Sequence, residues 1–155
     1  MNIRKAENNE KDCLLVFNLS NDPLVRENSF NTDPILYENH VRWYEKAAND
    51  ENILFFLIFE KEDFVGQIRF SRESIYSQKC VISLSITSKY RGRHIASSFL
   101  ELGIYEMKKN WKDIKMIMAE VKFGNEASNK MFIREGFNLI SSVNIYSRFV
   151  GGVHL

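Results

Sequence analysis

Apolar and polar residues alternate in the middle of the chain, and this pattern predicts three consecutive strands. Ile53 to Phe59 is rich in β-branched and aromatic residues, and Lys61-Glu62-Asp63 predicts a turn into a second strand from Phe64 to Ser71. A third strand, residues 81–87, alternates from Ile82 onward between isoleucine or leucine and serine or threonine. Because strand side chains point alternately to opposite faces, this strand has one core face and one face of small polar groups.

Helix signals precede these strands. After a short strand over residues 3–6, Asn8-Asn9 predicts the cap of a helix that ends before Asn21-Asp22-Pro23. Asp33-Pro34 predicts the start of a second helix, which runs to about Asn49, because aspartate is a good N-cap and proline suits the first helical turn. The polar residues between the two helices are expected to be irregular.

The second half of the chain alternates between helix and strand signals. From Gly92 to about Asn110, apolar residues recur at helical spacing and predict a helix with a buried face. The whole order predicts an α/β protein with a central mixed sheet of about six to seven strands and about four helices on its faces. The remaining expected elements are a strand over residues 115–121, a helix over 125–135, and strands over 139–143 and 145–150.

Composition and charge limit the classes of partner. The 155 residues suit a single domain, 1–155, and 21 Lys and Arg against 20 Asp and Glu give a formal net charge of +1. Near-neutrality argues against a nucleic-acid-binding protein, which normally has a basic excess. The longest apolar run is the size of a strand, so we expect no membrane partner.

The cysteines and the N-terminal sequence indicate a cytoplasmic protein. The first residues contain no apolar signal segment, and Cys13 and Cys80 lie far apart, which favours reduced thiols over a single disulfide. No spacing of cysteine, histidine and carboxylate residues predicts a metal site. His40 is expected to be half-exposed in its helix, and His154 lies next to the C-terminal residue.

The passage from the third strand into the next helix carries the clearest chemical signal. A basic loop with Lys89, Arg91 and Arg93 surrounds Gly92 and leads into the helix. Free backbone N–H groups and the positive dipole end of a helix bind anions, so this loop predicts a pyrophosphate site. A solvated basic loop is the alternative. The loop lacks the glycine patterns of Rossmann and P-loop sites.

This loop resembles the hallmark of the GNAT acetyltransferases. Their pattern Gln/Arg-x-x-Gly-x-Gly/Ala is matched by Arg91-Gly92-Arg93-His94-Ile95-Ala96, except that His94 replaces the middle glycine. Residues 119–137 resemble the family's fifth strand and fourth helix, with the ending aromatic-x-x-x-Gly-Phe. The resemblance implies the GNAT fold, acetyl-CoA as co-substrate without a metal, and direct acetyl transfer to a primary amine.

The resemblance also implies where the coenzyme binds. The strand over residues 81–87 would pair with the pantetheine arm where it splays from the next strand, and the loop amides would hold the pyrophosphate. The amide of Asn125 would reach the arm; a plain helix N-cap is equally expected for this residue, and the two roles can coexist. His94 puts a side chain where glycine allows the closest approach; either its imidazole swings outward without further effect, or coenzyme binding is weakened. The implied coenzyme residues are Leu84, Ser85, Ile86, Arg91, Gly92, Arg93, His94, Ile95, Ala96, Ser97, Asn125 and Phe132.

Acetyl transfer needs a group that accepts a proton from the amine, and the leaving thiolate needs protonation or stabilisation. Glu120 matches a strand glutamate that is the base in some relatives, and apolar neighbours on its face are expected to raise its pKa. An exposed or ion-paired glutamate is the alternative. Phe132 occupies the position of the family's acidic tyrosine, so either Tyr146 or Tyr90 is the acid, or the thiolate leaves without one.

The expected acceptor is a small-molecule amine. Residues 21–30, 40–44 and 66–70 resemble a GNAT branch that acetylates amino sugars in pseudaminic-acid-type synthesis. That branch implies a nucleotide sugar, with transfer to the 4-amino group of a UDP-linked 4-amino-6-deoxy sugar. Polar side chains suit a hydroxylated or phosphorylated molecule, although a solvated loop is the alternative. The expected substrate-binding residues are Arg26, Glu27, Asn28, Gln67 and Arg69.

Two other functions stay open on the sequence. Glu120 allows an acetyltransferase of protein N-termini of the ribosomal-protein type, for which a groove of acidic and aromatic residues would be expected. Phe132 and His94 allow a non-catalytic acyl-CoA-binding module. A homodimer is compatible with all three.

Overall fold

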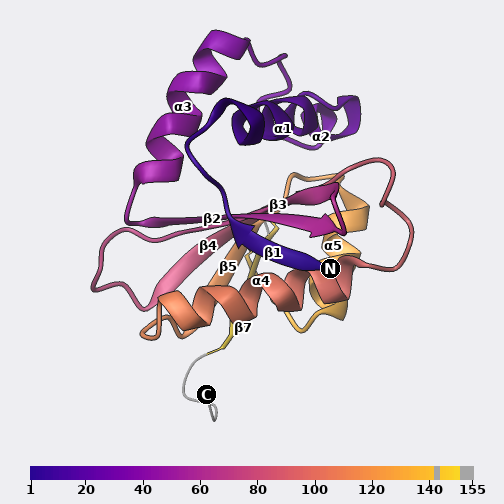
Figure 1. Cartoon of the computed structure of the whole chain (residues 1–155). Coiled ribbons are helices and arrows are strands. Elements are labelled where there is room, and N and C mark those ends of the chain that lie inside the picture. The colour runs from indigo at the N-terminus through magenta and orange to yellow at the C-terminus, as the bar shows by residue number, and fades with distance from the viewer. Residues whose placement is uncertain (142–143, 151–155) are drawn as a thin grey trace.

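A mixed seven-stranded sheet lies between helices in the computed structural model, which describes residues 1–141 and 144–150 (Figure 1). The strand order is β1-β2-β3-β4-β5-β7-β6, and only β4 and β5 run parallel to each other. The strands are β1 (Asn2–Lys5), β2 (Ile53–Glu60), β3 (Asp63–Ser71), β4 (Lys79–Ile86), β5 (Met116–Glu120), β6 (Asn138–Ser141) and β7 (Ile145–Phe149). The helices are α1 (Glu10–Ser20), α2 (Pro23–Glu27), α3 (Tyr37–Asn49), α4 (Ala96–Asn110) and α5 (Glu126–Arg134).

The two faces of the sheet carry separate cores. On one face, α1 and α3 bury Val16 and Tyr44 against Phe55 and Leu57 of β2. On the other, α4 and α5 cover a larger cluster that runs from β2 to β7, and Figure 1 shows α4 on the side of the sheet opposite α1 and α3. Alternating strand side chains supply both cores, as the sequence pattern predicts.

The predicted strands are confirmed within the described residues, with residues 142–143 of one of them lying outside that range, but the start of one helix is wrong. The helix expected from Asp33 begins at Tyr37, whereas Asp22 caps a short additional helix, α2, by accepting from the N–H groups of Leu24 and Val25. The Asn21 side chain bonds both backbone groups of Ile35, at 2.9 and 2.8 Å, and holds the chain before α3 outside the helix. The sequence Asp-Pro occurs twice, and it starts a helix at Asp22-Pro23 but not at Asp33-Pro34.

His40 is buried, not half-exposed. Only 2% of the residue is accessible, its Nε2 lies 3.0 Å from the carbonyl oxygen of Cys13, and its ring packs against Phe17, Trp43 and Tyr44. Burial lowers the pKa of His40, which keeps this ring neutral in the core. His154 lies outside the described residues.

Both cysteines are buried free thiols, in cores on opposite faces of the sheet. Burial raises the pKa of Cys80 to about 12 and also raises the pKa of Cys13, so both thiols are protonated at neutral pH.

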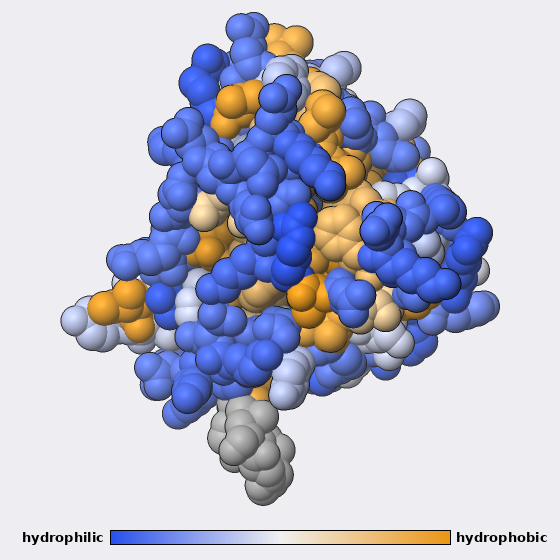
Figure 2. Space-filling model, in the orientation of Figure 1, coloured by the Kyte–Doolittle hydropathy of each residue, from blue (hydrophilic) through white to orange (hydrophobic). Residues whose placement is uncertain are grey.

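Hydrophilic residues cover most of the face shown in Figure 2, with smaller hydrophobic areas between them. Among the described helices, none has the length and apolar character needed to cross a membrane.

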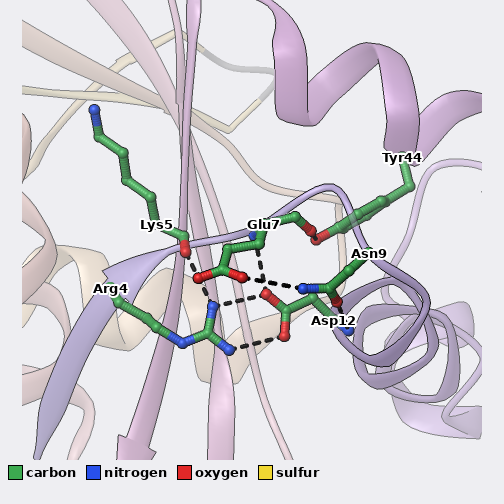
Figure 3. A network of polar contacts seen from close by, with 6 residues as sticks. All are labelled: Arg4, Lys5, Glu7, Asn9, Asp12 and Tyr44. Atoms are coloured by element: carbon green, nitrogen blue, oxygen red, sulfur yellow. Dashed lines mark hydrogen bonds and ion pairs between the residues drawn. The ribbon is translucent and has the colours of Figure 1, made fainter.

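An ion pair between the exposed Arg4 and the buried Asp12 joins β1 to the first helical layer (Figure 3). Asp12, 1% exposed, accepts from both terminal nitrogens of Arg4 at 2.7 and 2.8 Å and from the Glu7 N–H at 2.9 Å. The Tyr44 hydroxyl donates to the Glu7 carbonyl oxygen at 2.6 Å, which adds α3 to the network. Burial alone raises the pKa of Asp12, but the bonds from Arg4 and Glu7 outweigh it, and the net pKa is lowered.

We therefore expect Asp12→Asn to lower the free energy of unfolding at pH 7 by about 1–3 kcal/mol, because it removes a buried carboxylate that accepts hydrogen bonds from Arg4 and the Glu7 N–H. A carboxyl group whose pKa is lowered by folding stabilises the protein above its unfolded pKa of about 3.9, and this stabilisation is lost as the pH falls through the folded value. The difference between wild type and variant should shrink below about pH 4.

Urea denaturation between pH 3 and pH 7 measures this difference. Glu10→Gln is the matched control, since Glu10 is an exposed carboxylate in the same helical turn. A wild-type advantage that stays constant down to pH 3 would contradict the assignment.

Candidate functional site

The two parallel strands separate at the centre of the sheet. β4 and β5 are paired from Lys79↔Met116 only as far as Ile82↔Ala119. Beyond this pair β4 stays with β3 as far as Gly66↔Ile86, and β5 stays with β7 as far as Glu120↔Ile145. The edge of β4 that faces β5 is therefore open from residue 83 to residue 86, as the resemblance implies.

Gly66 allows β3 and β4 to stay together beyond this point. A Cβ atom at Gly66 would lie 2.3 Å from the carbonyl oxygen of Ser85, and no side chain is compatible with that distance. The close approach keeps β4 bound to β3 while β5 diverges. Leu84, Ser85 and Ile86, the residues expected along the coenzyme arm, lie on this open edge.

The loop between β4 and α4 contains two left-handed residues. Gly92 has φ +71° and His94 has φ +58°. His94 thus keeps the backbone conformation that glycine favours, at a cost of about 1 kcal/mol or more for a residue with a side chain. Ile95, the N-cap residue of α4, makes no side-chain capping bond. The first N–H groups of α4, from Ala96 and Ser97 onward, are available to an anion.

Most of the positive charge in this loop is already paired. Lys89 forms an ion pair with Asp63 of β3, which also accepts from the Tyr90 hydroxyl at 2.8 Å. Arg91 donates to the Ile86 carbonyl oxygen at 2.9 Å and lies 2.9 Å from the Asp22 carboxylate. Two of the three cations thus have carboxylate partners in the fold, and their role toward an anion remains a prediction. Of these three cations, only Arg93 forms no ion pair with a described residue, and its guanidinium carbon lies 5.4 Å from the centre of the Tyr90 ring.

Helix α2 links the two loops that flank the opening. At its first end, Asp22 pairs with Arg91 of the loop before α4. At its other end, the Glu27 carbonyl oxygen accepts from Lys122 Nζ at 2.7 Å, and Lys122 lies in the loop between β5 and α5. The short helix therefore spans the mouth between the diverging strands.

Glu120 ends β5 on the face of the sheet covered by α1 and α3. The expected apolar surroundings are not found, because Glu120 is exposed while Met116 and Met118 on the same face are half-buried. The carboxylate lies directly past the Ile82↔Ala119 pair, where the strands separate. Its role as a base remains a prediction.

The candidate acid lies on the opposite face. Tyr146 of β7 is 3% exposed, and its ring stacks on Phe132 with centroids 6.2 Å apart. Its hydroxyl donates to the Asn129 side-chain oxygen at 2.6 Å. The Tyr90 hydroxyl donates to Asp63, so neither tyrosine has a free hydroxyl proton. Asn125 caps α5 through the Ser128 N–H at 3.2 Å, which is the alternative that the sequence left open.

The expected acceptor residues divide into two groups. Gln67 and Arg69 lie on the same face as Glu120, and their side chains donate to Ser85 and Ser83 at 2.8 and 3.1 Å. Arg26 instead holds its own loop, donating to the carbonyl oxygens of Ser20, Asn31 and Asp33 and to the Ser29 hydroxyl. These bonds favour a structural role for Arg26. Glu27 is exposed, and Asn28 is the C-cap of α2.

Sequence reasoning missed Asp22, Asp63, Lys122 and Trp43. Asp22-Pro23 is a helix-start signal that identifies the first of them, but no local pattern shows the long-range contacts of the others. No group of three or more His, Cys, Asp or Glu in the described ranges is arranged to hold a metal ion.

Known proteins share this fold. The acetyltransferase of the GNAT family from Streptococcus pneumoniae is 19% identical and matches with a TM-score of 0.72 over 96% of this chain and 99% of its own. Spermidine N-acetyltransferase from Vibrio cholerae, in complex with CoA and spermine, is 14% identical with a TM-score of 0.79 over 96% of this chain and 94% of its own.

The ribosomal L7/L12 alpha-N-protein acetyltransferase RimL, in complex with coenzyme A, is 16% identical with a TM-score of 0.79 over 96% of this chain and 93% of its own. At these identities the similarity establishes the fold alone. Comparison with curated protein sequences gives no significant match.

The family model "Acetyltransferase (GNAT) domain" matches residues 1–138, which is most of the chain. Together with the separated parallel strands and the left-handed loop before α4, this match shows that the chain belongs to the GNAT acetyltransferase family.

Proposed function

We propose that the protein transfers the acetyl group of acetyl-CoA directly to a primary amine of a small molecule, in the opening between β4 and β5. The observation that carries this proposal is the open edge of β4 beside the left-handed loop. An extended arm with amide groups can pair with residues 83–86 as an added strand does. The loop amides before α4, with Arg93, are placed for a pyrophosphate.

The proposed reaction moves one acyl group and one proton. The neutral amine nitrogen attacks the thioester carbonyl carbon, and the carbon–sulfur bond breaks as the carbon–nitrogen bond forms. The proton lost by the nitrogen goes to Glu120, directly or through one water molecule. The sulfur leaves as a thiolate. Tyr146 is the candidate acid that protonates it, which requires its hydroxyl to leave Asn129.

We further propose that the acceptor is a nucleotide sugar with a free 4-amino group. Gln67, Arg69, Ser83 and Ser85 offer polar side chains on the face where Glu120 lies, beside the open edge of β4. Hydroxyl, amide and guanidinium groups suit a hydroxylated and phosphorylated molecule.

A thiol-release assay with acetyl-CoA tests the proposal against its alternatives. The panel contains a UDP-linked 4-amino-6-deoxy sugar, a ribosomal-protein N-terminal peptide and spermidine. Turnover of the amino sugar alone supports the full proposal, and turnover of the peptide alone assigns a protein acceptor. Coenzyme binding with no turnover on any amine would favour a non-catalytic acyl-CoA-binding module.

Gly92→Glu tests the pyrophosphate assignment. We expect acetyl-CoA affinity to fall about 30-fold or more, because a carboxylate would face the coenzyme phosphates. Gly92→Asn is the control, since asparagine tolerates the left-handed backbone and a Cβ at Gly92 meets nothing within 4 Å. Titration calorimetry measures both affinities, and an unchanged dissociation constant for Gly92→Glu would remove the assignment.

Glu120→Gln tests the proposed base. The rate of acetyl transfer in a single turnover at pH 7 should fall about 100-fold or more, because glutamine cannot accept the proton, while acetyl-CoA affinity stays the same. Glu126→Gln is the matched control, because Glu126 is an exposed glutamate at the start of α5. If Glu120→Gln and Glu126→Gln both react at the wild-type rate, another group accepts the proton.

A further inference from the structure

Arg69 is held in place by aromatic rings. Its guanidinium lies 4.7 Å from the centre of the Trp43 ring and 5.5 Å from that of Phe55. Nη2 donates to the Ser83 hydroxyl at 3.1 Å, and this is its only hydrogen bond within the described ranges. The Arg69 side chain is half-buried, so part of it remains accessible to a ligand. Its place over the two rings restrains the guanidinium and leaves most of its N–H donors without a described acceptor.

No described carboxylate forms an ion pair with Arg69, although Arg4, Arg91 and Arg148 each have one. Partial burial against Trp43 and Phe55 lowers the pKa of Arg69 to about 10, because the cation loses part of its hydration and gains no described anion. The fold therefore retains a positive charge that no described residue compensates.

Arg72, which directly follows β3, shows what a structural arginine looks like in this protein. It stacks on Trp111 at 4.2 Å, as Arg69 stacks on Trp43. However, Arg72 also donates to the Asn52 side-chain oxygen at 3.2 Å and to the Glu51 carbonyl oxygen at 3.4 Å. The N–H donors of Arg72 thus tie the end of β3 to the residues before β2, whereas most N–H donors of Arg69 have no described acceptor.

The position of Arg69 connects it to the acetyl-transfer site. Arg69 pairs with Ser83, the first β4 residue beyond the last pair with β5. Two residues along β3, Gln67 is 5% exposed and donates to Ser85, but its side-chain oxygen has no hydrogen-bond partner. A guanidinium with free donors and an amide with an unpaired acceptor thus lie side by side where the strands separate. A ligand that carries both an anion and an N–H or O–H donor would satisfy them.

We propose that Arg69 binds an anionic group of the acceptor, a phosphate or a carboxylate, so that the substrate class is an amine that also carries negative charge. This inference rests on the proposed acetyl transfer and narrows its substrate. The anion lies against the free edge of the guanidinium over Trp43, and the amine lies further along β3, toward Gln67 and the thioester. A polyamine would bring a second ammonium group to Arg69, which like-charge repulsion disfavours.

Anion binding can be measured without turnover, on the full chain saturated with CoA so that the pyrophosphate loop is already filled. The probes are inorganic phosphate, UDP and acetate, with spermidine as the cationic comparison. Calorimetry gives the affinities. Fluorescence in a Trp111→Phe background, where Trp43 is the sole tryptophan, reports whether the probe reaches the Arg69 stack.

We expect phosphate or UDP to bind and to change Trp43 fluorescence, and Arg69→Gln to weaken that binding about 10- to 100-fold. Arg69→Lys should be intermediate, because lysine keeps the charge but not the planar donor set. Arg72→Gln is the matched control and should bind as the wild type does. Tighter binding of UDP or phosphate than acetate identifies a phosphate-bearing acceptor, and the reverse order identifies a carboxylate.

Two results would overturn the inference: no anion binds to the CoA-saturated wild type at about 10 mM, a weak limit for a specific site, or Arg69→Gln binds it equally well. Spermidine binding that is tighter than that of every anion would also contradict it. Failure of the proposed acetyl transfer is seen separately, as CoA release from no amine, because the binding measurement does not depend on turnover.

Discussion

The end of pairing between β4 and β5 at Ile82 and Ala119 determines where chemistry can take place. A paired sheet would separate the two helical layers completely, since every backbone group between the strands would be hydrogen-bonded. Gly66 keeps β4 against β3, and β7 holds β5, so the sheet opens at this point without losing pairing elsewhere. The open edge, the left-handed loop and the N-terminus of α4 all meet at this opening.

The alternation of side chains places the two candidate proton-transfer groups on opposite faces. Glu120 belongs to the face of Gln67 and Arg69, whereas Tyr146 pairs with Ala119 and packs beneath α5. Both can approach one reacting centre only because the strands diverge between them. In the reaction that we propose, the acceptor and the coenzyme would enter from opposite sides of the sheet.

Local patterns predict elements, and distant contacts decide how their side chains are used. The alternation from Ile82 to Thr87 identified the polar face of β4, which is where Ser83 and Ser85 meet Arg69 and Gln67. The basic run was found, but its pairing with Asp63 and Asp22 depends on residues 26 and 69 positions earlier in the chain. The same limit explains Asp33-Pro34, where the distant Asn21 side chain holds the backbone extended, and His40, whose burial depends on α1.

The segment from Ser20 to Tyr37 contains little regular structure, yet its conformation is fixed from within and from outside. Arg26 bonds four acceptors of this segment, Asn21 bonds Ile35, and the loops on both sides of the opening hold α2 through Arg91 and Lys122. The conformational entropy of this segment is therefore lost when the chain folds, before any ligand binds. A ligand that enters meets a preorganised wall, and its binding free energy is not reduced by the ordering of a loop.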